Sequence, residues 1–253
     1  MKITFLGTGT SFGVPVIGCR CVVCRSDDPK NKRTRSSLHL SWEGTSLLID
    51  ASTDFRFQAL AAGLDSLDGL LITHPHADHI HGLDDIRVFT REKEIPVFGS
   101  EKTLAELRLR FSYIFEKTQE GGGKPRISLN PVVPGQPFRF RNRDFLPVGI
   151  RHGELDILGY RWDRTAYLTD CSAVPEASRS LLEGLDLLIL GTLRHRPHPT
   201  HFSVSESLAL IRELQPRRVL FTHMCHDLEH QELDEELPEH VSPAWDGQIL
   251  EMP

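Results

Sequence analysis

Short apolar segments alternate with polar turns along most of the chain. They are rich in Ile, Val, Leu and Phe, the side chains that favour β-strands. The pattern predicts strands at Lys2–Leu6, Leu38–Ser41, Ser46–Ile49, Gly69–Ile72, Pro96–Gly99, Phe138–Phe140, Phe145–Arg151, Ile157–Arg161, Ala166–Thr169, Leu185–Leu190 and Arg218–Thr222.

Four other segments carry apolar residues at helical spacing. In one of them Leu104, Leu107 and Phe111 fall on a single face, which predicts burial of that face. Ser203 and Glu206 have the spacing of a capping box before another. The predicted helices are Phe55–Ala62, Lys102–Phe115, Pro175–Gly184 and Val204–Leu214. Strands interspersed with helices predict an α/β protein, and we expect a single domain over residues 1–253.

Composition excludes some classes of protein. The chain has 253 residues, 35 acidic and 29 basic, with a net charge of −6, which argues against a dedicated DNA-binding protein. No apolar run approaches the ~18 residues of a membrane span. The N-terminus turns polar too early for a signal peptide, so we expect a cytoplasmic protein.

Histidines supply the strongest chemical signal. The 13 histidines come in groups, and the run Thr73-His74-Pro75-His76-Ala77-Asp78-His79 directly follows a predicted strand. Imidazole suits Zn, Mn, Fe or Ni, and a nearby carboxylate allows two ions to be held side by side. The run therefore predicts a metal site.

This run is similar to the signature of the metallo-β-lactamase superfamily of two-metal hydrolases. The resemblance implies a four-layer αβ/βα sandwich with metal ligands on loops along one edge of two packed sheets. Four more of the family's motifs are present in the expected order, one before this run and three after it. Asp50 after Leu47–Ile49 resembles an aspartate that supports the metal loop, and His152, Asp170 and His223 resemble its remaining ligands.

The resemblance also implies how the ligands divide between two divalent ions, Zn or Mn. One ion takes His74, His76, His152 and Asp170. The other takes Asp78, His79, Asp170 and His223. Asp170 bridges the two ions and, with Asp78, belongs to the catalytic residues; a hydroxide between the ions attacks phosphorus.

The five cysteines favour metal binding over disulfides, because the number is odd and three of them are clustered. Cys19, Cys21 and Cys24 have the spacing of three ligands of a structural zinc site. After the segment Leu6–Pro15 this cluster resembles the branch that contains phosphoribosyl 1,2-cyclic phosphate phosphodiesterase. In that branch a histidine in the position of His226 supplies the fourth ligand; Cys225 is the competing candidate.

Several features complete the resemblance or stay open. His201 precedes the capped helix where phosphodiesterases of the family place a histidine that is not a metal ligand, and it would protonate the leaving oxygen. Asp246 resembles a terminal Asp-Gly turn of the branch. Cys171 is either a buried neighbour of Asp170 or a metal contact. The glycine-rich segment Thr118–Arg126 is either a lid or a long connection.

Together these features favour a dinuclear metal-dependent phosphodiesterase with one further structural zinc. We expect its substrate to be a small phosphodiester, in particular a cyclic ribosyl phosphate. The alternatives are a ribonuclease Z-like enzyme that trims transfer-RNA 3′ ends and a non-catalytic metal-binding carrier. We expect no membrane partner and no nucleic acid partner; a homodimer is compatible with the resemblance.

Overall fold

The computed structural model describes residues 1–117 and 123–252, which form two compact units. The first unit comprises Met1–Leu6, Ser37–Val132 and Gly247–Pro253, and the second comprises Gly7–Ser36 and Val133–Asp246. Each unit contains one seven-stranded mixed sheet with helices. The single domain over residues 1–253 stays a prediction.

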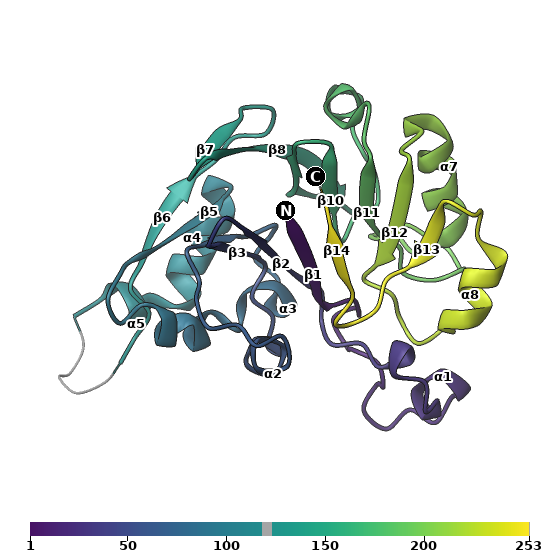
Figure 1. The fold of residues 1–253 in the computed structure, drawn as a ribbon, viewed down its shortest axis with the longest axis horizontal. Helices are drawn as coiled ribbons and strands as arrows, with labels where there is room; N and C mark the ends of the chain where they lie inside the picture. The colour runs from purple at the N-terminus through teal and green to yellow at the C-terminus, as the bar shows by residue number, and fades with distance from the viewer. Residues whose placement is uncertain (118–122, 253) are drawn as a thin grey trace. The chain divides into compact units, whose positions relative to one another are not determined.

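The sheet of the first unit has the order β14-β1-β2-β3-β4-β5-β6 (Figure 1). Its strands are β1 (Lys2–Gly7), β2 (Ser37–Trp42), β3 (Thr45–Ile49), β4 (Gly69–Leu71), β5 (Ile95–Gly99), β6 (Ile127–Pro131) and β14 (Ile249–Glu251). Strands β3 to β6 are parallel, whereas β2–β3 and β1–β14 are antiparallel pairs. Parallel neighbours need crossover connections, so the helices of this unit come between them.

Those helices are α2 (Phe55–Ala61), α3 (Ala77–Ile80), α4 (Glu101–Arg110), α5 (Ser112–Phe115) and the 3₁₀ segment Leu83–Phe89. The predicted helix Lys102–Phe115 is wrong in one respect: it is two helices, because Phe111 leaves helical geometry with φ −114° and ψ 39°. Leu107, Phe111 and Ile114 are nevertheless all buried, as the spacing predicted. The change of direction keeps the ring of Phe111 and the side chain of Ile114 in the same core.

The sheet of the second unit has the order β13-β12-β11-β10-β9-β8-β7 (Figure 1). Its strands are β7 (Phe138–Phe140), β8 (Arg143–His152), β9 (Leu155–Trp162), β10 (Thr165–Leu168), β11 (Leu187–Gly191), β12 (Arg218–Thr222) and β13 (Val241–Pro243). Strands β7 to β10 form antiparallel hairpins, and β10 to β13 are parallel.

The helices of the second unit are α1 (Val22–Arg25), α6 (Glu176–Arg179), α7 (Val204–Leu214), α8 (His230–Glu236) and the 3₁₀ segments Pro29–Asn31 and Ser180–Leu182. The predicted helix Pro175–Gly184 is shorter than expected, because its second half is the 3₁₀ segment. The capping box of Ser203 and Glu206 is confirmed. Leu210 and Ile211 of α7 pack into the core of the sheet.

Strand ends carry the residues that the sequence singled out. Asp50 follows β3, Asp170 lies two residues after β10, and His223 follows β12. All three have left-handed backbones, with φ of 61°, 51° and 56°. Such geometry is costly for residues other than glycine and is concentrated at functional sites. The backbone therefore turns sharply where each of these side chains leaves its sheet.

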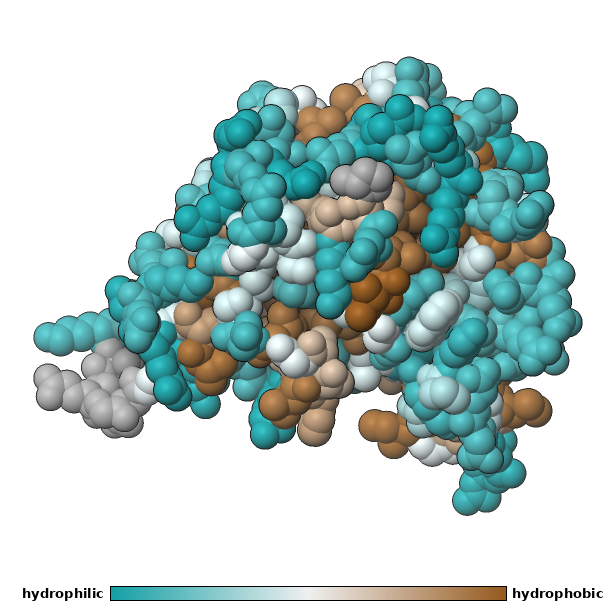
Figure 2. Space-filling view, viewed as in Figure 1, coloured by the Kyte–Doolittle hydropathy of each residue, from teal (hydrophilic) through white to brown (hydrophobic). Residues whose placement is uncertain are grey.

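The face in Figure 2 is mainly hydrophilic, with scattered apolar patches. Exposed apolar side chains of the second unit include Phe12, Ile17 and Val22. None of the helices formed by the described residues is both long enough and apolar enough to cross a bilayer.

Candidate metal centres

The first unit contributes one contiguous set of candidate ligands. Strand β4 ends at Leu71, and the following residues lead through His74 and His76 into the short helix α3, which carries Asp78 and His79. His74 and His79 are fully buried. A loop that leaves a strand end thus brings imidazole and carboxylate groups together, as the run predicted.

Asp50 holds this loop in place through hydrogen bonds to its carboxylate. Its Oδ1 accepts a 2.8 Å hydrogen bond from the backbone N–H of Thr73, and its Oδ2 accepts one of 2.8 Å from the Thr73 hydroxyl. Nδ1 of His79 donates to the same Oδ2 at 2.7 Å. Burial raises the pKa of Asp50, and His79 and Thr73 counteract this rise. The supporting role predicted for Asp50 fits these contacts.

The same contacts select the tautomers of two histidines. The hydroxyl hydrogen of Thr73 goes to Asp50, so its oxygen accepts from Nδ1 of His74, 3.0 Å away. His79 likewise uses its Nδ1 hydrogen for Asp50. In both rings Nε2 then keeps its lone pair, which is the form that binds a metal.

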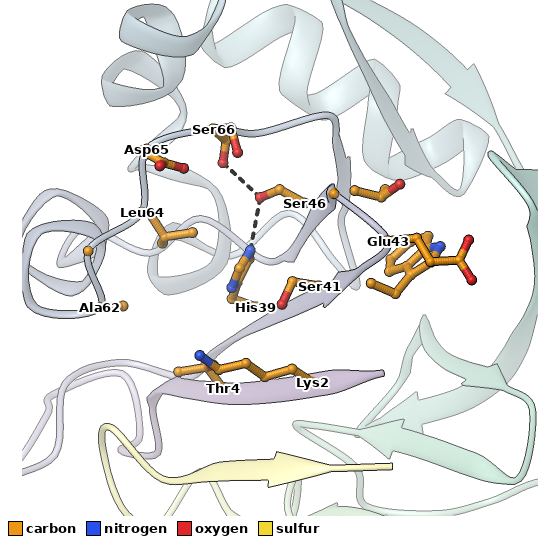
Figure 3. Close-up of a pocket in the computed structure, with 14 residues that line it drawn as sticks. Lys2, Thr4, His39, Ser41, Glu43, Ser46, Ala62, Leu64, Asp65 and Ser66 are labelled. Atoms are coloured by element: carbon orange, nitrogen blue, oxygen red, sulfur yellow. Dashed lines mark hydrogen bonds between the residues drawn. The ribbon is translucent and has the colours of Figure 1, made fainter. Parts of the chain in front are cut away.

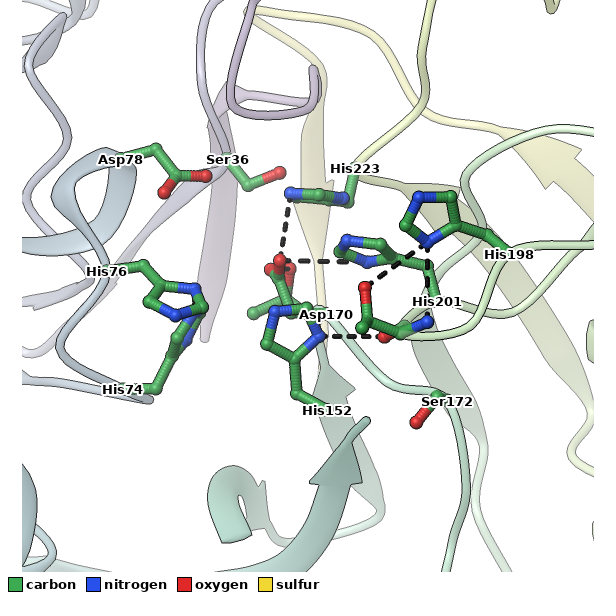
Figure 4. Close-up of polar contacts among 12 residues, drawn as sticks. Ser36, His74, His76, Asp78, His152, Asp170, Ser172, His198, His201 and His223 are labelled. Atoms are coloured by element: carbon green, nitrogen blue, oxygen red, sulfur yellow. Dashed lines mark hydrogen bonds and ion pairs between the residues drawn. The ribbon is translucent and has the colours of Figure 1, made fainter. Parts of the chain in front are cut away.

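Distances within this set fit metal coordination. Nε2 of His74 lies 3.0 Å from Nδ1 of His76 (Figure 4). Two imidazole nitrogens on one tetrahedral zinc ion are about 3.3 Å apart. Nε2 of His79 lies 3.3 Å from Oδ2 of Asp78. The set therefore offers convergent nitrogen and oxygen donors without rearrangement.

The second unit contributes a set assembled from separate segments. Figure 4 shows His152, His201 and His223 around the carboxylate of Asp170. Oδ1 of Asp170 lies 3.1 Å from Nε2 of His223 and 3.7 Å from Nδ1 of His201. Oδ2 accepts a 2.8 Å hydrogen bond from Thr169. Ligand atoms of His152, Asp170 and His201 lie close enough together to hold an ion.

The groups that orient this second set could not be identified from the sequence. Nδ1 of His152 donates to the carbonyl oxygen of Thr200 at 2.7 Å, which again leaves Nε2 with the lone pair. At Gly191, a Cβ atom would lie 2.9 Å from the backbone nitrogen of Asp170. Glycine on β11 therefore makes room for the turn at Asp170. Backbone contacts of this kind leave no side-chain pattern to recognise.

His201 lies in a crowded, mostly buried position. Its ring stacks on that of His223, with centroids 4.9 Å apart and planes inclined by 18°. Burial lowers the pKa of His201 to about 3, and His223 adds to this effect. The cationic form is therefore disfavoured until a negatively charged group lies beside it. Its neighbour His198 lies 5.1 Å away, between ring centroids.

The three clustered cysteines meet His226. Nδ1 of His226 lies 3.3 Å from Sγ of Cys19 and 3.5 Å from each of the other two sulfurs, Cys21 and Cys24. A tetrahedral zinc ion with standard bond lengths places sulfur and nitrogen about 3.5 Å apart. Cys225 is outside this cluster, and its sulfur accepts from the backbone N–H of Asp227. The geometry fits a zinc ion and favours His226 as the fourth ligand.

The thiols of this cluster differ in acidity. Hydrogen bonds from Cys21 lower the pKa of Cys19 to about 7, whereas burial raises the pKa of Cys24 to about 11. A bound cation would keep all three as thiolates. Cys171, by contrast, is fully buried and directs its thiol to the carbonyl of Ala173, and burial raises its pKa.

A buried network of hydrogen bonds is centred on Asp246 and Thr8. Asp246 accepts hydrogen bonds from the backbone and hydroxyl of both Thr8 and Thr34, at 2.7–2.8 Å. The carbonyl of Thr8 accepts from the backbone N–H of Met224 at 3.0 Å. Arg33 donates to Thr8 as well, at 2.8 Å. Asp246 thus supports the backbone next to His223, which is more than an isolated turn would do.

The first unit also holds an open pocket of about 480 Å³ away from the histidine run (Figure 3). Its lining includes Lys2, His39 and Asp65. Nε2 of His39 lies 2.9 Å from the hydroxyl of Ser46, which itself donates to the carbonyl of Ser66 at 2.7 Å. Charges of both signs line the pocket, so it selects no single class of ligand. Residues 118–122 of the predicted loop Thr118–Arg126 lie outside the described residues.

Comparison with known proteins gives four informative likenesses, two of them from sequence and two from solved structures. Residues 45–224 match the model of the beta-lactamase superfamily domain. An octanoyltransferase of Porphyromonas gingivalis is 40% identical over 250 residues, which is 98% of this chain but 51% of that protein. The chain therefore spans about half the length of that relative.

Two solved structures extend the comparison. A structure described as a new diphosphatase from the PhnP family has a TM-score of 0.93 and 41% identity, and covers 100% of this chain and 98% of its own. Zinc-bound PqqB from Methylobacterium extorquens has a TM-score of 0.82 at 18% identity, with both chains covered in full (100%). The second likeness concerns the fold alone.

Proposed function

The chain belongs to the beta-lactamase superfamily, and on this premise we propose that it is a metal-dependent phosphodiesterase for small substrates. The substrate class that we propose is a cyclic ribosyl phosphodiester. The observation that carries the proposal concerns three histidines. His79, His74 and His152 donate their Nδ1 hydrogens to Asp50, Thr73 and the carbonyl of Thr200, respectively. This arrangement presents Nε2 lone pairs from three rings to metal ions.

The likeness to a PhnP-family diphosphatase supports hydrolysis at phosphorus. Family members of the metallo-β-lactamase fold bind divalent metals, and zinc-bound PqqB is one. We propose that both histidine and aspartate sets serve two such ions, Zn or Mn, with the ligand division that the motifs imply. When bound, such ions supply an acidified water and neutralise charge on phosphoryl oxygens.

The residues of the chain would then divide the work. Asp50 orients His79, and the carbonyl of Thr200 orients His152. His201 lies next to Asp170, and burial lowers its pKa to about 3. A bound phosphodiester anion would raise this pKa, so that His201 takes up a proton from solvent as the substrate binds. We propose that His201 contacts the phosphate and delivers this proton to the leaving oxygen.

Two other activities remain as alternatives. Hydrolysis of a diphosphate bond is the activity for which the PhnP-family relative is named. Processing of transfer-RNA 3′ ends is the activity of a ribonuclease Z-like enzyme, to which the net charge of −6 is poorly suited. The octanoyl transfer named for the Porphyromonas relative is not carried over, because the match spans half of that protein.

The test is a turnover assay on zinc- and manganese-loaded protein with four substrates. They are a ribosyl 1,2-cyclic phosphate, a nitrophenyl phosphodiester, a nucleoside diphosphate and a precursor transfer RNA. His201→Ala is assayed alongside, with His195→Ala as control because His195 is exposed and pairs with Glu236. We expect turnover of the cyclic phosphate, reduced about 10²-fold or more by His201→Ala alone.

Activity on RNA alone would replace the proposal with the ribonuclease, and activity on the diphosphate alone would replace it with the diphosphatase. Metal-loaded protein that turns over none of the four would contradict an enzymatic role. Equal rates for His201→Ala and His195→Ala would remove the proton-donor role.

A further inference from the structure

A second pocket of the first unit has four cations among its seven described lining residues, the other three being Val88, Thr90 and Gly123. Its volume is about 250 Å³, and Arg87, Arg91, Lys124 and Arg126 line it together with Val88 and Thr90. It lies where the 3₁₀ segment Leu83–Phe89 ends and where the chain approaches β6. No acidic side chain is among its described lining residues.

These cations are held in place by neutral groups. Nζ of Lys124 donates to the carbonyls of Tyr113 and Glu116. A guanidinium nitrogen of Arg126 donates to the carbonyl of Arg91 at 3.4 Å. Carbonyl oxygens orient a cation without cancelling its charge. The positive charge of Lys124 and Arg126 is therefore not cancelled by these contacts.

Arg87 is the exception, because it pairs with a carboxylate, and that carboxylate also accepts a hydrogen bond from a tyrosine. It pairs with Asp84 at 2.5 Å, and the same carboxylate accepts the hydroxyl of Tyr113 at 2.6 Å. Asp84 is not part of the pocket lining. A net positive pocket on a protein of charge −6 is a local reversal of sign. Such a reversal attracts anions and costs stability unless one binds.

Thr90 connects the two segments that line the pocket. Thr90 is buried, its hydroxyl donates to the carbonyl of Arg87 at 3.0 Å, and it accepts from the backbone N–H of Arg126 at 3.1 Å. The side chain of Thr90 thus links the segment that carries Arg87 and Arg91 to the segment that carries Lys124 and Arg126.

We propose that this pocket is an anion site that takes the phosphate group of a small molecule, with Arg91, Lys124 and Arg126 as its cationic contacts. Planar guanidinium groups bind phosphate oxygens in pairs, and lysine adds a point charge. The confined volume fits one compact anionic group. A nucleic acid is disfavoured, because its many phosphates would meet the negative charge of the rest of the protein.

The site is independent of the proposed hydrolysis, since none of its lining residues belongs to the histidine and aspartate sets. Arginine footprinting of the metal-loaded protein with phenylglyoxal tests it residue by residue. Inorganic phosphate and ribose 5-phosphate are the probes, each balanced against chloride at constant ionic strength. We expect protection of Arg91 and Arg126, while Arg139, which is exposed and pairs with Asp144, reacts at its usual rate.

Calorimetric titration of variants gives the second measurement. The double variant Arg91→Gln/Arg126→Gln should bind the better probe at least about tenfold more weakly at this site, with Arg139→Gln as matched control. Phosphate that binds at the catalytic metals, and turnover itself, should be the same in both. The tighter of the two probes identifies whether free phosphate or a phosphate ester is the natural source.

Three results would overturn the proposal. They are equal protection of Arg91, Arg126 and Arg139, unchanged affinity in the double variant, or protection by a single-stranded oligonucleotide at lower phosphate concentration than either small probe. The last result would assign the pocket to nucleic acid.

Discussion

The two units supply their candidate ligands in opposite ways. The first unit takes them from one run of six residues, His74 to His79, backed by a single aspartate. The second takes them from the ends of β8, β10 and β12 and from the approach to α7, with intervals of tens of residues between them. The first set is therefore a local motif, whereas the second exists only once a sheet has formed.

The means of support differ as well. In the first unit a side chain, Asp50, orients both the loop and His79. In the second unit the corresponding support for His152 is a backbone carbonyl, and Gly191 supports Asp170 by its lack of a side chain. Support from a side chain can be recognised in the sequence and removed by substitution. Support from a backbone carbonyl can be neither recognised nor removed in this way. Four experiments sharpen this contrast.

The largest effect is expected for Asp170→Ala. Loss of this carboxylate should release at least one catalytic metal ion and reduce turnover by about 10³-fold or more, because a catalytic ion contributes several kcal/mol. Metal content by atomic emission and the rate on the cyclic phosphate are the readouts. Asp156→Ala, which removes an exposed partner of Arg151, is the control. Activity close to wild type in Asp170→Ala would contradict the two-metal proposal.

Asp50→Asn should have the next largest effect. Asparagine keeps the size of the side chain and tolerates the left-handed backbone at this position, φ 61°. It replaces an acceptor oxygen by a donor amide, so the backbone N–H and hydroxyl of Thr73 and Nδ1 of His79 can no longer all donate to it. We expect metal affinity and turnover to fall by roughly 10–100-fold. If both stay unchanged, side-chain support is not what orders the loop.

Cys21→Ser separates structural from catalytic metal within the second unit. We expect the loss of one zinc ion per chain and a melting temperature lower by several degrees, since metal binding contributes to folding. Turnover of the folded protein should change less than about threefold. Cys225→Ser is the matched control and should retain its zinc, because Cys225 lies outside the cluster. Zinc loss in that control instead would make Cys225 the ligand.

The smallest effect concerns the pH dependence of stability. Burial lowers the pKa of His39 to about 4 from an ordinary value of 6.5. The unfolded chain therefore takes up a proton first, and the free energy of unfolding should fall as the pH drops from 6.5 to 4, by about 2 kcal/mol. His39→Gln should flatten this part of the curve in urea titrations. An identical pH profile in the variant would refute the assignment.

The family and the metallo-β-lactamase fold, predicted from the order of the motifs, are confirmed. All the predicted strands are present, because each contributes at least one buried apolar side chain to its sheet. The strands β6, β13 and β14 were missed. Val241-Ser242-Pro243 is short and contains a proline, and β14 depends on pairing with the distant β1. Pairing partners far apart in the sequence leave no local signal.

The candidate site shows the same division. The cysteines, the histidine run and Asp50 were identified because their spacing is local or follows a strand. The roles of Thr73, Thr200 and Gly191 depend on a hydroxyl, a carbonyl and an absent Cβ atom, which are common to many positions. The bound metals, the substrate, a possible homodimer and the cytoplasmic location remain predictions.

The cysteine cluster has a consequence for the protein while it is being synthesised. Cys24 and His226 are 202 residues apart in the chain. At about 5–20 residues per second of synthesis, the three thiols wait roughly 10–40 seconds for their fourth ligand. Until Val133 has been made, the segment from Gly7 to Ser36 has no partner from its own unit. Oxidants, competing metal ions and chaperones would therefore meet this segment first on the ribosome.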